Sequence, residues 1–391
     1  MFILLPNIKQ KRLIAVCLFL FWAMTCFNAF AKKQFPSLTS QDLKMLGVVN
    51  LPKNIVIQES YKGIKFFATP SKRYSNEQII LLKFFIDRTP SALLEYGPDA
   101  IVNAEAGFLP SMAQASGPFV FFESTAFNTD GFWSAGSLED VFRGFIHELV
   151  HVYQFRKALE TIDLEKARTK FKHSRSQTLW DFAVMDTNLI GSFANITEWK
   201  LDKGCITTAR LTDFKNAKTS NYGRVSIMED MAETVSLVTI GDLTPLSDQR
   251  IQWAINFLGY KSLEAALKDT FPYSKQFELV KMGSSITKFN HDKVQEYKKK
   301  YKISDVAHFV SKNDGHFQEI VSILAQGFSN RGWKNILTKD VTLKHNIKKH
   351  IFEYQGKWRD VYIEVISYED ATGYLRKPEK SIITVLSGYK L

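Results

Sequence analysis

The sequence predicts an α+β fold on three observations. Short apolar stretches with strand character lie early in the chain, at 54–58, 64–68 and 118–128. Apolar residues recur at helical spacing over 138–155 and 251–267. Towards the end of the chain, strand-like stretches alternate with turns that contain glycine, which indicates a small β-rich tail.

These patterns divide the chain into parts. Residues 32–137 form a mixed α and β part, in which Ser75 begins a helix. Residues 138–245 carry two helices with an insertion between them. Residues 246–330 are a helical region that includes a lysine-rich helix face, and residues 331–391 are the β-rich tail.

The first 31 residues have the pattern of a bacterial signal peptide. Basic residues up to Arg12 precede an apolar run over 13–27, and Ala29-Phe30-Ala31 offers a cleavage site between small residues. The run is shorter than the roughly 20 residues that span a bilayer, so an uncleaved anchor is the weaker interpretation. A lipid anchor at Cys26 is also weaker, because the usual leucine and small residues do not precede it. We therefore expect cleavage after Ala31 and a secreted or periplasmic protein.

Composition limits the partners of the exported chain. Cleavage would leave Cys205 as its single cysteine, so no internal disulfide would stabilise it. Removal of three of the 51 basic residues leaves 48 against 40 acidic ones, a net charge of +8. This charge permits contact with an anionic envelope surface, although a solvated surface is the simpler explanation. We expect a monomer, and we expect no nucleic acid partner because no basic stripe with interleaved aromatic residues is present.

A His-Glu-x-x-His motif, formed by His147, Glu148 and His151, is the strongest chemical signal in the chain. On a helix, residues four apart lie on one face, so the two imidazoles can bind one metal ion. Glu148 could then reach a water molecule as a general base. We expect this helix over 138–155 with Ser137 as its N-cap. The alternative is an ordinary amphipathic helix with two satisfied histidines.

A catalytic zinc ion takes three protein ligands, so the two histidines need a third. The glycine and third histidine that extend this motif in one class of zinc peptidases are absent. Glu229 and Glu233 share one face of a later predicted helix. We expect Glu229 to bind the metal and Glu233 to orient a ligand histidine. Taken alone, Ser226 and Glu229 would more simply form a capping box.

Tyr222 lies seven residues before Glu229 and is followed by Gly223, which lets the chain turn. A phenol above the metal could donate to the oxyanion that forms when water attacks a carbonyl. A lone tyrosine is more often a packing residue, so spacing alone does not establish this role.

Two further segments could line or cover a substrate cleft beside the motif helix. The strand expected over 118–128 precedes the motif helix, and in zinc peptidases such a strand lines the cleft and pairs with substrate through its free edge. An ordinary core strand is an equally good interpretation. Residues 156–220 form the insertion, which either covers the cleft or packs as helices with a solvated charged face.

Three segments together resemble the catalytic domain of anthrax lethal factor and the related secreted Pro-Pro endopeptidases, which are zinc metallopeptidases of the gluzincin type. The segments are Tyr222-Gly223-Arg224, Glu229-x-x-Ala232-Glu233 and His147-Glu148-x-x-His151. The resemblance implies a zincin-like metallopeptidase domain in which Glu229 is the third zinc ligand, Glu148 the base and Tyr222 an aid to the transition state. It covers the motif segments firmly and residues 50–270 loosely. The 78-residue step from His151 to Glu229 (229 minus 151) is longer than the family pattern and implies the insertion.

The sequence therefore predicts an exported endopeptidase with one Zn²⁺ ion that hydrolyses a protein or peptide substrate by metal-activated water. Two alternatives stay open. One is a catalytically inactive zincin-like protein that binds the envelope, and the other is a zinc amidase that acts on cell-wall cross-links. The six histidines outside the motif show no ligand spacing.

Overall fold

The computed structural model describes 33, 35, 37–103, 113–127, 138–165, 188–201, 209–211, 219–220, 222–268, 270–272, 277–279, 304–311, 317–342, 348–356, 359–367 and 381–389. The expected signal peptide, the Ser137 cap, much of the insertion and the lysine-rich face at 295–301 lie outside these residues. Within them, no helix is both long enough and apolar enough to cross a bilayer.

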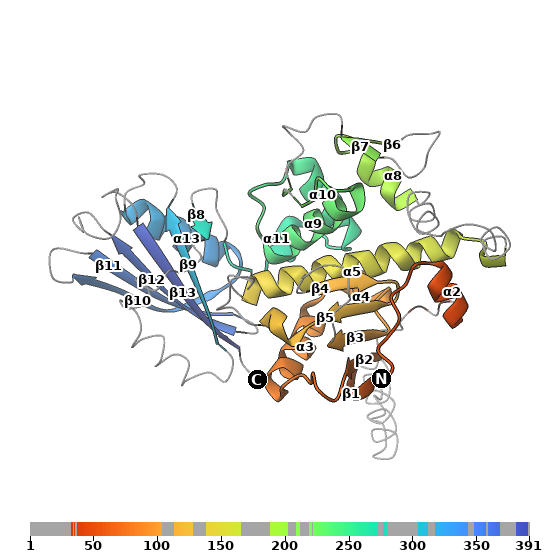
Figure 1. Cartoon of the computed structure of the whole chain (residues 1–391). Coiled ribbons are helices and arrows are strands. Elements are labelled where there is room, and N and C mark those ends of the chain that lie inside the picture. Colours follow the sequence, from red (N-terminus) through yellow and green to blue (C-terminus); the bar gives the residue numbers. More distant parts are fainter. Residues whose placement is uncertain are drawn as a thin grey trace, which may run out of the picture.

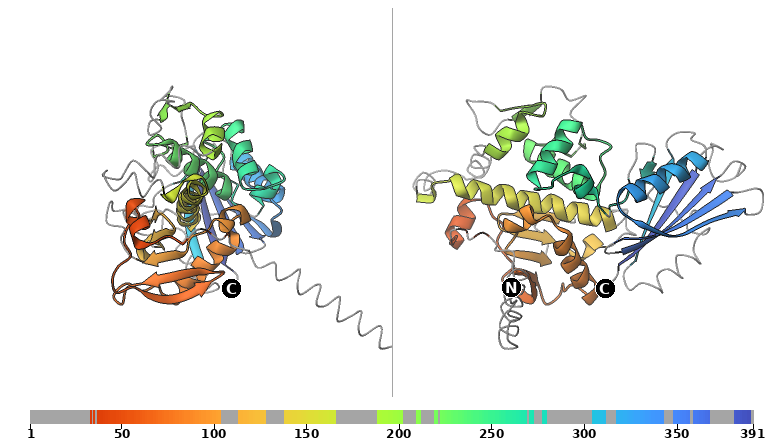
Figure 2. Two further views of the ribbon diagram at one scale, coloured as in Figure 1. Left: turned by 90° about the vertical axis from the view of Figure 1, so that its right-hand side faces the viewer. Right: turned by 180° about the vertical axis from the view of Figure 1, so that it is seen from behind.

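The described residues form a mixed α+β structure around one long helix, α5 (Leu138–Thr161). Figure 1 shows a sheet on one side of α5 and a group of helices on the other, and the rear view in Figure 2 shows the same layers. A second sheet lies beyond one end of α5. The helix expected over 138–155 is confirmed and continues to Thr161.

The first sheet has the strand order β1-β2-β3-β5-β4. Its strands are β1 (Val56–Tyr61), β2 (Ile64–Ala68), β3 (Ala100–Asn103), β4 (Ala113–Ser116) and β5 (Phe119–Phe122). The central strands β2, β3 and β5 are parallel, and β1 and β4 run antiparallel at the two edges. The helices of this part are α2 (Ser40–Met45), α3 (Asn76–Arg88) and α4 (Ser91–Glu95). Ser75 caps α3 as expected, and its hydroxyl accepts from the N–H of Gln78.

The strand expected over 118–128 is shorter than predicted, and of its two interpretations the structure shows the core strand. It ends at Phe122, and Ser124–Phe127 forms the 3-10 turn η1. The chain leaves the sheet there because the Ser124 N–H bonds the side chain of Asn103 at 2.9 Å instead of a strand. Among the described strands β5 lies between β3 and β4, so the free edge beside α5 belongs to β4.

On the other side of α5 lie α8 (Asn188–Ala194), α9 (Ile227–Ile240), α10 (Asp248–Phe257) and α11 (Leu263–Leu267). A two-stranded ribbon, β6 (Trp199–Leu201) with β7 (Ala209–Leu211), adjoins them. Helix α9 is almost wholly buried, which explains its run of apolar and small residues. It ends at Gly241, whose φ of +83° a residue with a side chain rarely adopts.

The second sheet has the order β10-β11-β12-β13-β9-β8. Its elements are β8 (Phe277–Leu279), β9 (Ser304–Ser311), β10 (Lys334–Thr342), β11 (Lys348–Gln355), β12 (Arg359–Ser367) and β13 (Ser381–Tyr389). Helix α13 (Phe317–Asn330) packs on one face through Leu324 and Phe328. The expected helical region 246–330 thus also contains strands, because β9 pairs with β13 at the far end of the chain. Local periodicity does not reveal such a long-range partner.

Candidate metal site

Helices α5 and α9 pack directly on each other, and this contact builds the site. Phe145 and Leu149 on α5, and Met231 and Val235 on α9, are buried in one core. Ala232 has no exposed surface and its small side chain lets the two backbones approach. The polar side chains beside this seam therefore face one another across a short distance.

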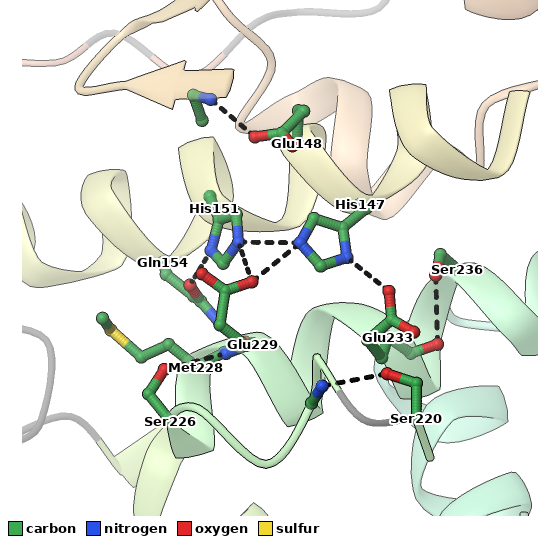
Figure 3. A network of polar contacts seen from close by, with 12 residues as sticks. His147, Glu148, His151, Gln154, Ser220, Ser226, Met228, Glu229, Glu233 and Ser236 are labelled. Carbon is green, nitrogen blue, oxygen red and sulfur yellow. Dashed lines mark hydrogen bonds and ion pairs between the residues drawn. The ribbon is translucent and has the colours of Figure 1, made fainter. Parts of the chain in front are cut away.

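Three expected ligand atoms converge at this seam (Figure 3). The Nε2 atom of His147 lies 2.9 Å from Oε2 of Glu229, and the Nε2 atom of His151 lies 3.1 Å from the same oxygen. The two Nε2 atoms are 3.1 Å apart. The sequence-predicted group of His147, His151 and Glu229 is thus brought together from two helices.

The donor set fits a zinc ion. Zinc bonds of about 2.0–2.1 Å at tetrahedral angles place ligand atoms about 3.3 Å apart, close to the three distances here. Two imidazole nitrogens and one carboxylate oxygen are also a ligand set of catalytic zinc sites. If both Nε2 atoms present lone pairs, they repel each other unless a metal ion or a proton lies between them.

Each histidine is also held through its other ring nitrogen. Nδ1 of His147 lies 3.1 Å from Oε1 of Glu233, the glutamate expected beside it, at ion-pair distance but without the geometry of a hydrogen bond. Nδ1 of His151 lies 2.8 Å from Oε1 of Gln154, whose Nε2 donates to the carbonyl of Met228 at 3.1 Å. When both Nδ1 atoms carry hydrogen, both Nε2 atoms present lone pairs to a metal.

Sequence reasoning missed Gln154 and Arg143. Gln154 lies three residues after His151, and Arg143 lies four before His147, where its guanidinium forms an ion pair with Glu233. Helical spacing from the motif was the signal that could have found both, because residues three or four apart share a face. Burial acts to raise the pKa of Glu233, but the contact with His147 and then the charge of Arg143 lower that pKa to about 2.

The carboxylates determine the protonation of the metal-free site. Burial acts to lower the pKa of His147, but the bonds to Glu229 and Glu233 outweigh it and raise that pKa to about 10. Burial likewise opposes ionisation of Glu229, yet the two histidines hold its pKa far below the usual range. At neutral pH the metal-free site therefore holds a proton, which a bound metal must displace.

Glu148 lies apart from the three ligand atoms. It is 9% exposed, and its Oε2 accepts from the backbone N–H of Ala115 on the edge strand β4 at 2.5 Å. In Figure 3 its carboxylate points to that strand, away from Glu229. Its charge still contributes to raising the pKa values of His147 and Tyr222, which places it within electrostatic reach of the site.

Tyr222 stands beside the histidines. Its ring centroid lies 5.8 Å from that of His147, and the residue is 53% exposed. Partial burial and then the charges of Glu229 and Glu148 raise the pKa of Tyr222 well above its usual value. The phenol therefore keeps its proton at neutral pH and can donate a hydrogen bond.

Of the capping box considered for Ser226 and Glu229, the structure shows only the bond made by the Ser226 side chain. The Ser226 hydroxyl accepts from the backbone N–H of Glu229 at 3.2 Å and caps α9. The Glu229 carboxylate, however, bonds the histidines and does not return to the Ser226 backbone. One residue thus serves the helix start with its backbone and the site with its side chain.

Replacement of Gln154 by Leu is expected to weaken the binding of a metal ion at this site by about 10–100-fold, because His151 loses the acceptor that fixes its ring. Gln154→Glu keeps an acceptor and should retain most of the affinity. Competition with a chromophoric chelator measures both constants. Equal affinities for Gln154→Leu and the unaltered protein would show that Gln154 does not orient the ligand.

Within the part of the chain that the structure describes, His147, His151 and Glu229 are the single group of three or more His, Cys, Asp or Glu side chains placed to hold a metal ion. Comparison of the chain with protein-family models, curated proteins and solved structures finds no match. The functional assignment therefore depends on the geometry of this site.

Proposed function

We propose that the chain is an exported zinc-dependent endopeptidase with a zincin-like catalytic domain. The observation that carries the proposal is the convergence of His147, His151 and Glu229 on one point, with both histidines oriented by further side chains. Such orientation is typical of metal ligands. An ordinary pair of helix histidines would not need it.

Zinc bound by these residues would acidify a water molecule and polarise the carbonyl of a peptide bond. Glu148 takes the proton of the attacking water and passes it to the leaving amine. Its bond to the Ala115 N–H fixes the direction in which its carboxylate points. Tyr222 donates its phenolic hydrogen to the developing oxyanion.

Strand β4 supports an extended peptide as the substrate. Among the strands that the structure describes, β4 is an edge of the sheet, and it packs against α5. Because the Ala115 N–H points to Glu148 and not to β5, this edge faces the proposed base. A substrate strand that pairs with β4 would therefore lie with its backbone close to Glu148.

The test is metal analysis of the protein purified without residues 1–31, combined with digestion of a peptide library that contains proline-rich members. We expect one zinc ion per chain and cleavage that a chelator abolishes and added zinc restores. Absence of zinc would overturn the proposal. Zinc without cleavage of any peptide would favour the binding protein, and cleavage of wall fragments alone would favour the amidase.

A further inference from the structure

The turn that carries Tyr222 is fastened to α9 by residues just before it. The Thr219 hydroxyl donates to Oδ1 of Asp230, and the hydroxyl of Ser220 accepts from the N–H of Gly223 at 2.9 Å. Figure 3 shows Ser220 and this bond below Glu233. The position of the phenol therefore depends on how firmly α9 holds Thr219.

Asp230 is a rigid attachment point. It is 3% exposed, and Arg250 of α10 donates to both of its oxygens, from Nη1 to Oδ1 at 2.9 Å and from Nη2 to Oδ2 at 2.8 Å. The indole N–H of Trp199 donates to Oδ2 at 2.8 Å. A buried, paired and fully bonded carboxylate has little freedom to move.

Gly223 lies so close to this attachment that no side chain fits. A Cβ atom there would be 2.3 Å from Oγ1 of Thr219 and 3.3 Å from Oδ1 of Asp230. The residue after Tyr222 thus packs directly on the Thr219–Asp230 bond. Asp230 is also the residue after Glu229, so one turn of α9 contacts both the ligand group and the Tyr222 turn.

We propose that Asp230, fixed by Arg250 and Trp199, is a positioning residue that holds Tyr222 over the metal site through Thr219. This inference rests on the proposed function for the role of Tyr222. Helix α9 then has three acidic residues with separate tasks. Glu229 binds the metal, Glu233 orients His147, and Asp230 fixes the proposed oxyanion donor.

Thr219→Val tests the proposal, because it removes the hydroxyl while keeping the shape and leaves Arg250 bonded to Asp230. We expect kcat to fall about tenfold with zinc affinity within about twofold, since small displacements of an aligned group are costly. Thr219→Ser keeps the hydroxyl and should restore most of the rate. Tyr222→Phe should reduce kcat about 100-fold, in the range for loss of one oxyanion donor.

The double variant Thr219→Val/Tyr222→Phe separates positioning from general damage. If Thr219 acts through the phenol, the double variant should be no slower than Tyr222→Phe alone. A further tenfold loss in the double variant would overturn the proposal. So would a Thr219→Ser variant as slow as Thr219→Val.

A measurement without substrate distinguishes failure of this inference from failure of the proposed function. In metal-free protein, Thr219→Val should speed amide hydrogen exchange of Gly223 and Val225, whose N–H groups bond Ser220 and the Tyr222 carbonyl within the turn. Exchange in the core of α9 should not change. Unaltered exchange in the turn would refute the attachment, whether or not the protein is a peptidase.

Discussion

The Glu148→Gln variant is expected to bind one zinc ion and to lose about 10²–10⁴-fold in kcat, the range for loss of a general acid–base. The amide resembles the carboxylate in shape, and its oxygen can still accept from the Ala115 N–H. It cannot take a proton from water at neutral pH. Metal analysis and steady-state kinetics on one cleaved peptide measure the two properties separately.

Glu139→Gln is the matched control, because Glu139 lies in the first turn of the same helix, about two and a half turns before Glu148. It should keep both zinc and rate. Full activity of Glu148→Gln would remove Glu148 from the mechanism and leave the proposed hydrolysis without a base. Loss of zinc in that variant would instead indicate that the change disturbed the helix.

The residues of the metal site could be predicted because their relations are local or follow from chemistry. The spacing of His147 and His151 fixes a shared helix face, and a zinc ion requires a third ligand. Among later acids, Glu229 and Glu233 repeat the same spacing. That the histidine pair and Glu229 meet in space was inferred from the presence of both motifs in one chain. The structure brings these three side chains together.

The supporting residues could not be predicted so readily. Ala113–Ser116 has little strand propensity, and it becomes a strand through pairing with β5 and packing on α5. Asp230, directly after Glu229 and three residues before Glu233, suggests a solvated charge on the helix surface. It is instead buried and paired with Arg250, 20 residues later in the chain. A buried ion pair between separate helices leaves no periodic signal in sequence.

The largest loss of metal is expected for Glu229→Ala. Two imidazoles alone leave a site one ligand short of the three that a catalytic zinc takes. The Glu229 carboxylate lies about 3 Å from each Nε2 atom. Its removal also takes away the negative charge that would offset the positive charge of a bound ion. We expect zinc affinity to fall by well over the roughly 10–100-fold typical of an orienting residue, and activity to vanish with it.

The zinc affinity of Glu229→Ala is compared with those of two control variants. Glu233→Gln, which alters only the residue behind His147, should bind zinc about 10–100-fold more weakly and stay partly active at high zinc. Glu264→Ala, at an exposed position of α11, should match the unaltered protein. Chelator competition measures all three on one scale. Stoichiometric, tight zinc in Glu229→Ala would mean that another side chain completes the site, and the proposed hydrolase would then lack its third ligand.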